Sequence, residues 1–344
     1  MRVLLTGAGG FVGHHTLAHL LKTTNWDFVI TDSFRHQGTT ARIRSVFEEL
    51  PQYRNRVTVV VHDLRVPFDN VTINEIGECE VAINMASESH VDRSIIEPRS
   101  FIENNVQLML TMVEWARRQS KLQLFLQIST DEVFGPAPEG SYHKEWDSIC
   151  PSNPYSASKA SQEAIAISYW RTYDIPIIIT NTMNIIGERQ DVEKFVPRII
   201  DCLSREEKVP VHAQLIEERW TAGSRFYLHA RNQADALRYL IESYLSEGTR
   251  YSQGLQKLPR FNIVGEREIF NDEMVRLIAD FMGIQNKSNI INYVNVEGTR
   301  PGHDLRYALD GSKMSELGWS APVKFEESLR RTVQWSLANR SWLL

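Results

Sequence analysis

Short apolar runs alternate with longer segments of helical periodicity through the first half of the chain. The apolar runs are typical of buried strands in a parallel sheet, which carry hydrophobic side chains on both faces. The expected strands are 2–5, 28–31, 56–63, 80–85, 122–128 and 176–182, and the clearest helices are 16–21, 101–118 and 155–173. This regular alternation predicts an α/β fold with a doubly wound parallel sheet of the Rossmann type.

The alternation ends near residue 183. Helices are then expected at 194–204, 232–247, 268–281, 311–317 and 325–337, and strands at 208–214, 225–229, 261–264 and 290–296. We expect residues 1–182 to form the Rossmann domain and residues 183–344 to form most of a smaller, interleaved substrate lobe. Segments near 228–250 and 261–266 are expected to return to the first domain.

A glycine-rich turn, TGAGGFVG, follows the first predicted strand and leads into a helix. Gly7, Gly10 and Gly13 suit a tight turn whose backbone approaches a pyrophosphate, and the amides at a helix start favour an anion. The sequence therefore predicts a dinucleotide site at these glycines and at Phe11 and Val12 between them.

Acidic residues end the second and third predicted strands. Asp32 can accept hydrogen bonds from both hydroxyls of an adenosine ribose and would repel a 2′-phosphate, which favours NAD. The nearby Arg35 keeps NADP open. Asp63, followed by Leu64, is expected to reach the adenine amino group, with a solvated strand-end acid as the alternative. Ala86, a small residue after the fourth strand, would let the cofactor lie against the backbone.

Tyr155 and Lys159 lie four residues apart at the start of a predicted helix, so they are neighbours on one helix face. A cation beside a phenol stabilises phenolate and lowers its pKa from ~10 toward neutrality. Such a phenol can take a proton from an alcohol. Thr130, at the preceding strand end, is a natural hydrogen-bonding partner for the same hydroxyl. An ordinary surface pair is the alternative.

With these motifs together, the sequence resembles the extended short-chain dehydrogenases/reductases. Within that superfamily it resembles the nucleotide-sugar 4,6-dehydratases, the family typified by dTDP-glucose 4,6-dehydratase. The resemblance covers almost the whole chain, and its segments are ASESHVDRSI (86–95), STDEVFG (129–135), NPYSASKA (153–160) and RPGHDLRYALD (300–310).

The resemblance implies that a sugar is oxidised at C4, loses water across C5–C6 and regains hydride at C6, with NAD as a bound cofactor. Glu132 would then be the base for the C5 proton and Asp131 the acid for the C6 hydroxyl, while Tyr155, Lys159 and Thr130 serve the oxidation. Successive strand side chains face opposite ways, so both acids can serve one substrate only if the backbone leaves the strand at 131. Two solvated acids are the alternative for this pair. A 5,6-dehydratase, an epimerase or decarboxylase, and a non-catalytic NAD-binding module are the alternative functions.

The resemblance also implies substrate contacts at Ser89, His90, Asn184, Lys194, Arg225, Arg300 and His303. The arginines suit a diphosphate because a planar guanidinium matches phosphate oxygens. Two motifs depart from the family. Its R-x-x-N-N-Y-G-P becomes NTMNIIGE at 181–188, and its R-D-W-x-Y-V-x-D becomes RFYLHARN at 225–232. These changes leave the nucleotide and the sugar open between dTDP- and UDP-hexoses.

Charge and composition exclude several other classes. A formal net charge of −5 argues against nonspecific nucleic-acid binding. Three widely spaced cysteines suggest neither a zinc cluster nor a disulfide framework, so no metal is expected. No apolar run approaches the ~20 residues of a membrane helix, and the first strand leaves no room for a signal peptide. We expect a cytoplasmic enzyme, and the resemblance adds a homodimer joined through the helices near 101 and 155.

Overall fold

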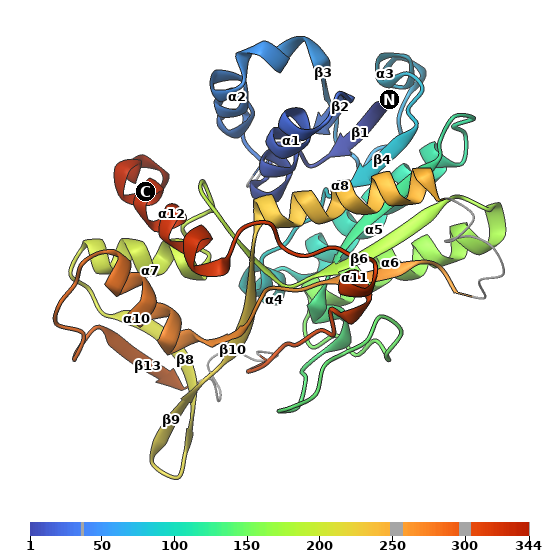
Figure 1. Ribbon diagram of the computed structural model, residues 1–344. Coiled ribbons are helices and arrows are strands. Elements are labelled where there is room, and N and C mark those ends of the chain that lie inside the picture. Colours follow the sequence, from blue (N-terminus) through green and yellow to red (C-terminus); the bar gives the residue numbers. More distant parts are fainter. Residues whose placement is uncertain (36–37, 248–256, 296–303, 344) are drawn as a thin grey trace.

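Seven parallel strands form the central sheet of the computed structural model (Figure 1), which describes residues 1–35, 38–247, 257–295 and 304–343. The strand order is β11-β6-β5-β4-β1-β2-β3. The strands are β1 (Arg2–Thr6), β2 (Asp27–Asp32), β3 (Val57–Val61), β4 (Val81–Asn84), β5 (Leu124–Thr130), β6 (Ile177–Thr182) and β11 (Arg260–Ile263). Each strand coincides with an apolar run of the sequence, and the predicted doubly wound Rossmann sheet is confirmed.

Helices cover both faces of this sheet (Figure 1). On one face lie α1 (Phe11–Thr23), α2 (Thr40–Glu49) and α8 (Ala230–Ser246), and on the other lie α3 (Asn70–Ile76), α5 (Pro98–Ala116) and α6 (Pro154–Tyr173). The side chains of β1 divide between the two resulting cores: Val3 and Leu5 enter the first and Leu4 the second, all fully buried. Burial on both faces explains why the strands read as continuous hydrophobic runs.

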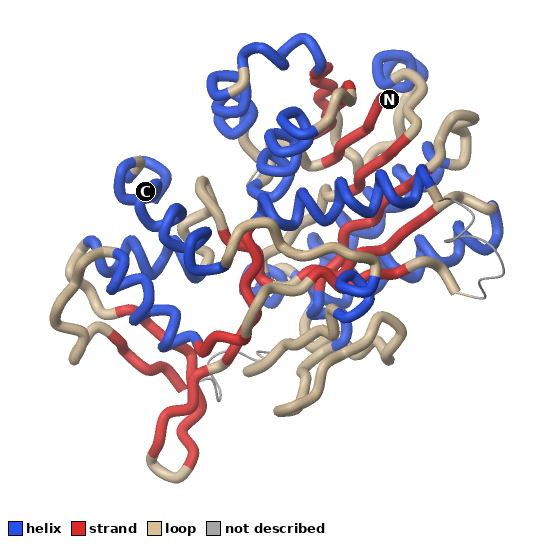
Figure 2. Tube along the Cα trace, viewed as in Figure 1, coloured by secondary structure: helices blue, strands red, loops and turns tan. Residues whose placement is uncertain are grey.

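Two small sheets and several helices build the second lobe, which Figure 2 shows beside the main sheet. One sheet joins β12 (Glu268–Phe270), β10 (Ser224–His229) and β7 (Asn184–Ile186), and the other joins β13 (Ile291–Asn295), β8 (Val209–Ile216) and β9 (Arg219–Ala222). The helices α7 (Phe195–Ser204), α10 (Asn271–Phe281) and α12 (Phe325–Ala338) share a buried core with them. Strands β7 and β9, with three and four residues, are too short to give a recognisable period.

Two segments that come late in the sequence, α8 and β11, pack with the elements of residues 1–182. Helix α8 packs on the same core as α1, and β11 pairs in parallel with β6, with Arg260 opposite Ile179 and Asn262 opposite Asn181. The smaller elements are η1 (Pro51–Arg56), α4 (Val91–Ile96), η2 (Asp131–Phe134), α11 (Ser312–Glu316) and η3 (Arg340–Leu343). Among the described helices, none combines the length and apolar character needed to cross a membrane.

Candidate active site

A cavity of about 360 Å³ opens at the carboxyl ends of the central strands. Ligands bind at this edge of open α/β sheets because loops and helix starts converge there. Every residue predicted to contact the cofactor lines the cavity: Gly7, Gly10, Phe11, Val12, Gly13, Asp32, Asp63, Leu64, Ala86, Tyr155 and Lys159. The predicted acids Asp131 and Glu132 line it too, as does Thr130.

The glycine turn is so tight that a side chain at Gly7 or Gly13 would collide with neighbouring backbone. Gly7 has a φ of +69°, and a Cβ there would lie 2.9 Å from the backbone of Ala86. A Cβ on Gly13 would lie 2.1 Å from the carbonyl oxygen of Gly7. Gly10 is the N-cap of α1, whose first residues face the cavity. This backbone cradle at a helix start fits a dinucleotide pyrophosphate.

Asp32, at the end of β2, is fixed by two backbone amides. Gly9 N donates to Oδ2 over 2.9 Å and Phe34 N donates to Oδ1 over 2.8 Å. Burial raises the pKa of this carboxyl, and the hydrogen bonds from the two backbone amides act against that shift. The carboxylate is therefore held rigidly at the strand tip, in the place that suits an adenosine ribose.

Asp63 ends the neighbouring strand region and binds two arginines. Arg35 Nη2 lies 2.9 Å from Oδ1, and Arg65 Nη2 donates to Oδ2 over 2.9 Å. Burial alone would raise the pKa of Asp63, but the hydrogen bonds from Arg65 and the charge of Arg35 lower it overall. Arg35, the residue that kept NADP open, is thus paired with an acid. This pairing favours the NAD alternative.

Tyr155 and Lys159 are positioned by the start of α6. Asn153 caps the helix by accepting from Ser156 N, and the Ser156 hydroxyl accepts from Asn153 N in a capping box. The Lys159 ammonium is buried and donates to the Ile128 carbonyl over 2.7 Å and to a side-chain oxygen of Gln162 over 2.7 Å. Burial lowers the pKa of Lys159 to about 8.

The prediction that a cation lowers the pKa of Tyr155 is wrong for this arrangement. Burial raises the pKa of the phenol, and the carboxylates of Glu132 and Asp131 raise it further, while the Thr130 hydroxyl acts in the opposite direction. Helical spacing revealed one nearby cation, Lys159, but not the two acids that the strand end brings to the phenol. The phenol is therefore protonated over the neutral range.

The two acids meet the geometric condition for acting together. Strand β5 ends at Thr130 and the 3₁₀ helix η2 begins at Asp131, so the backbone leaves the strand where both carboxylates can face the cavity. Asp131 is 4% exposed, and its Oδ1 accepts from the Thr130 hydroxyl over 2.9 Å. Its Oδ2 has no hydrogen-bond partner among the described residues. Glu132 accepts from Asn153 Nδ2 over 3.2 Å.

Their environments divide these acids into different roles. Burial, and then the charge of Glu132, raises the pKa of Asp131 to about 7. Asp131 can therefore carry a proton near neutral pH beside the carboxyl of Glu132. A carboxyl that keeps its proton near neutral pH can serve as a general acid.

Four of the predicted substrate residues line the cavity: Ser89, His90, Asn184 and Lys194. Lys194 Nζ donates to the Ser89 carbonyl over 3.0 Å. His90 caps α4, since its Nδ1 accepts from Arg93 N over 3.1 Å. The remaining predictions at Arg300 and His303 lie outside the described residues.

Arg225 differs from the expectation of an open phosphate contact. It is 7% exposed and does not belong to the lining of the cavity in the described chain. Its guanidinium donates to the carbonyls of Ser224, Leu305 and Asp304 over 2.6–2.7 Å. The guanidinium of Arg225 is therefore occupied by backbone carbonyls of the second lobe. A direct contact of Arg225 with phosphate is not seen in this geometry and stays a prediction.

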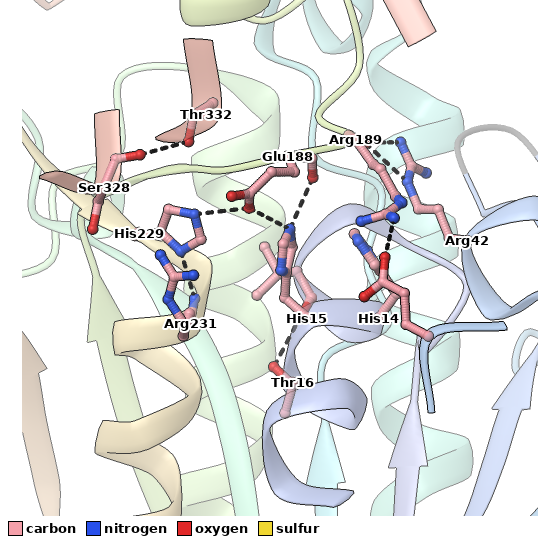
Figure 3. Close-up of polar contacts among 12 residues, drawn as sticks. His14, His15, Thr16, Arg42, Glu188, Arg189, His229, Arg231, Ser328 and Thr332 are labelled. Carbon is pink, nitrogen blue, oxygen red and sulfur yellow. Dashed lines mark hydrogen bonds and ion pairs between the residues drawn. The ribbon is translucent and has the colours of Figure 1, made fainter. Parts of the chain in front are cut away.

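Sequence reasoning missed the segment between β7 and α7, which adds Gln190, Asp191 and Glu193 to the cavity. Figure 3 shows how helices of the first half hold this segment. Arg42 Nη2 donates to the Arg189 carbonyl over 2.9 Å and to Asp191 over 2.7 Å. The polar run GERQDVEK between an apolar strand and a helix was the available signal.

Two departures from the family motifs meet in the same segment (Figure 3). Glu188 stands at the family's proline position and His229 at its tyrosine position. His229 Nε2 lies 3.0 Å from Glu188 Oε2, and His15 Nε2 of α1 lies 2.8 Å from the Glu188 carbonyl. Glu188 and His229 therefore bond to each other, and His15 ties Glu188 to α1 of the first half.

Comparison with known proteins agrees with this site. The model of the GDP-mannose 4,6 dehydratase family matches residues 4–332. The chain belongs to this family. One relative, a probable dTDP-glucose 4,6-dehydratase of Sinorhizobium fredii, is 34% identical over 99% of this chain and 94% of its own length. The dTDP-glucose 4,6-dehydratase of Salmonella typhimurium is 31% identical over 100% of this chain and 94% of its own length.

A solved dehydratase has the same fold throughout. The crystal structure of DesIV, a dTDP-glucose 4,6-dehydratase from Streptomyces venezuelae with NAD and TYD bound, superposes with a TM-score of 0.84 at 29% identity. The match covers 99% of this chain and 98% of that one. The predicted membership in the dehydratase family is confirmed along essentially the full chain.

Proposed function

We propose that the protein is an NAD-dependent nucleotide-diphosphate-sugar 4,6-dehydratase that acts on a dTDP- or UDP-hexose. The observation that carries the proposal is the convergence of a phenol, an ammonium and two carboxyls on one cavity beside a glycine cradle. These groups are Tyr155, Lys159, Asp131 and Glu132. Relatives that align over nearly their whole length carry the dehydratase name, which supports the same chemistry here.

The cofactor would lie along the strand ends. Gly7, Gly10 and Gly13 would receive the pyrophosphate together with the helix-start residues Phe11 and Val12, while Asp32 would accept from the adenosine ribose. Asp63 and Leu64 would line the adenine, and Ala86 would pack against the cofactor. Bound NAD would supply the acceptor of hydride for the oxidation and its source for the final reduction. The NAD in the DesIV crystal structure supports this cofactor.

The side chains around the sugar would move its protons. Tyr155 would take the proton of the C4 hydroxyl, with Thr130 orienting the phenol and Lys159 holding the nicotinamide ribose. The base role needs the phenolate, which the positive charge of bound oxidised NAD would favour against the burial and the two acids that disfavour it. Glu132 would remove the C5 proton as an ionised base. Asp131, protonated near neutral pH, would deliver a proton to the departing C6 hydroxyl. Water is lost in this step, which leaves a double bond between C5 and C6. Return of hydride to C6 and of a proton to C5 would then give a 4-keto-6-deoxy sugar.

The nucleotide end of the substrate would lie over the second lobe. Ser89 and His90 would face the sugar, Asn184 the diphosphate and Lys194 the nucleotide. These four residues share the cavity with the acids. We propose Arg225, Arg300 and His303 as further contacts by family resemblance. Residues 1–182 with α8 and β11 would then act as the NAD-binding domain, and most of 183–344 as the substrate lobe.

We also propose a cytoplasmic homodimer that pairs through α5 and α6. Apolar side chains near these helices are open in the single chain, with Ile96 78% and Ile102 40% exposed. Burying such side chains against a second copy would remove them from water. Sedimentation at micromolar concentration tests the dimer, and a monomer there would contradict it.

The decisive experiment offers dTDP-glucose and UDP-glucose to the purified protein and weighs the products. Loss of one water supports a dehydratase and excludes an epimerase or a decarboxylase. Substrate deuterated at C4 then distinguishes the two kinds of dehydratase by the position of the label in the product. Deuterium returns to C6 in a 4,6-dehydratase and to C4 in a 5,6-dehydratase. If neither sugar changes and no reduced cofactor forms transiently, the protein is a non-catalytic NAD-binding module and the proposal is wrong.

Two variants test the roles proposed for Asp131 and Glu132. Asp131→Asn and Glu132→Gln should still oxidise the sugar at C4 but fail to release water, because each lacks one proton transfer. Asp147→Asn, a carboxylate 46% exposed and outside the cavity lining, is the matched control and should behave as wild type. Full dehydratase turnover in either cavity variant would refute the role given to that acid.

A further inference from the structure

A buried ion pair between Arg260 and Glu163 lies near the end of β5, where Thr130 precedes the two acids. Arg260 of β11 is 1% exposed and Glu163 of α6 is fully buried, and Arg260 Nη2 lies 2.5 Å from Glu163 Oε2. The guanidinium also lies 4.7 Å from the ring centre of Phe134. Phe134 belongs to η2, the short helix that carries Asp131 and Glu132. The pair therefore touches the element that holds both acids.

Asn181 connects the ion pair to β5. Its Oδ1 accepts from Arg260 Nε over 2.7 Å, and its Nδ2 donates to Glu163 Oε1 over 2.8 Å and to the Thr130 carbonyl over 2.9 Å. The guanidinium therefore comes from β11, the strand beside β6, and the Asn181 amide spans the gap between it and Thr130.

Glu163 also acts on the catalytic lysine. It lies one helical turn after Lys159 on α6, and its charge raises the pKa of Lys159 against the lowering caused by burial. Without Arg260, Glu163 would be a buried carboxylate with Lys159 as its nearest charge partner on the same helix. A buried charge that loses its partner is costly, so Glu163 would draw the ammonium away from the Ile128 carbonyl.

We propose that Arg260 is a positioning residue for the dehydratase reaction. Through Asn181 it fixes the Thr130 end of β5, and through Glu163 it fixes the turn of α6 that carries Lys159. Arg260 touches neither substrate nor cofactor in this account. The inference rests on the proposed function, because its first readout is turnover of the nucleotide sugar.

The test compares Arg260→Met, Arg260→Lys and a relocated pair, Arg260→Asn with Asn181→Arg. Lys313→Met is the matched control, since Lys313 Nζ donates to the carbonyl of Arg260 over 2.7 Å and not to its side-chain partners. Turnover is expressed per folded, NAD-loaded site, and KM for the sugar is measured in parallel. Hydrogen exchange of the peptide over 124–135 reports the strand end without any need for turnover.

Loss of the guanidinium should lower kcat by about 10- to 100-fold with KM and NAD content retained, as expected for small misplacements of catalytic groups. The relocated pair should recover part of that loss relative to Arg260→Asn alone, and Lys313→Met should keep the wild-type kcat. Exchange over 124–135 should accelerate in Arg260→Lys and not in the control. Should Arg260→Met fail to fold, the lysine variant and the relocated pair decide the matter.

Two results would overturn the inference. One is a wild-type kcat in folded Arg260 variants with unchanged exchange over 124–135, and the other is a relocated pair no better than Arg260→Asn alone. A wild-type protein that converts no nucleotide sugar overturns the proposed function instead. In that event the exchange comparison still decides whether Arg260 fixes the strand end.

Discussion

Replacing Asp131 by asparagine should stabilise the protein increasingly as the pH rises. Burial and the charge of Glu132 raise the pKa of Asp131 from 3.8 to about 7, so this carboxyl ionises less readily in the folded chain than in the unfolded one. Below the unfolded value the group is protonated in both states and the shift has no effect. The destabilisation grows between pH 3.8 and about 7 and is complete above that range.

The size of the effect follows from the two values. A difference of about three pKa units corresponds to about 4 kcal/mol, at about 1.4 kcal/mol per unit. Asparagine cannot ionise, and its Oδ1 can still accept the hydrogen bond that Thr130 makes with Asp131. Asp131→Asn therefore removes the unfavourable ionisation and keeps the local contact.

Urea unfolding of both proteins at about pH 5 and about pH 8 measures this effect. The stability advantage of Asp131→Asn over wild type should be about 3 kcal/mol larger at the higher pH. Asp147→Asn, at an exposed site, should show no such pH dependence. Glu132→Gln should lower the pKa of Asp131, since one of the causes of its shift is removed, so the destabilisation should be smaller and should level off at a lower pH. An advantage equal at both pH values would refute the reasoning.

Three further changes probe the cofactor cradle and the segment between β7 and α7 that lines the cavity. Gly13→Ala should abolish retention of NAD on gel filtration, because its Cβ would lie 2.1 Å from the Gly7 carbonyl oxygen; retained cofactor would contradict the cradle. Arg42→Met should lower the free energy of unfolding by about 3 kcal/mol in urea titrations, because Asp191 loses its ion-pair partner. An unchanged midpoint would argue against that anchor. Asp32→Ala should raise the affinity for NADP relative to NAD in calorimetry, since the repelling carboxylate is gone.

The parts of this molecule that sequence predicts well depend on short-range patterns. Most strands of the main sheet contain a run of apolar residues bounded by turns, and the glycine turn and Asp32 follow from spacing within one βαβ unit. Two neighbouring acids can serve one substrate only if the backbone leaves the strand at Asp131, and the structure has η2 begin at this residue. Local pattern and catalytic logic therefore agree at the centre of the site.

What sequence did not predict depends on partners far along the chain. The pKa of Tyr155 follows from acids on a different element, and Arg225 is turned away from the cavity by carbonyls at 304 and 305. Strand β7 exists because β10 pairs with it, not because three residues encode a strand. Such long-range contacts leave no periodic trace in the sequence.

The position of β11 bears on how this protein is made in a cell. Strand β6 is buried along its entire length, and one of its edges pairs with β11, which lies nearly eighty residues later. At ordinary translation rates of about 5–20 residues per second, the ribosome needs roughly 4–16 seconds to synthesise the chain between β6 and β11, and this edge stays unpaired for that time. During this interval an apolar edge strand of the nascent chain is open to pairing with other chains. Slower elongation between these strands should therefore increase the dependence of the newborn protein on chaperones.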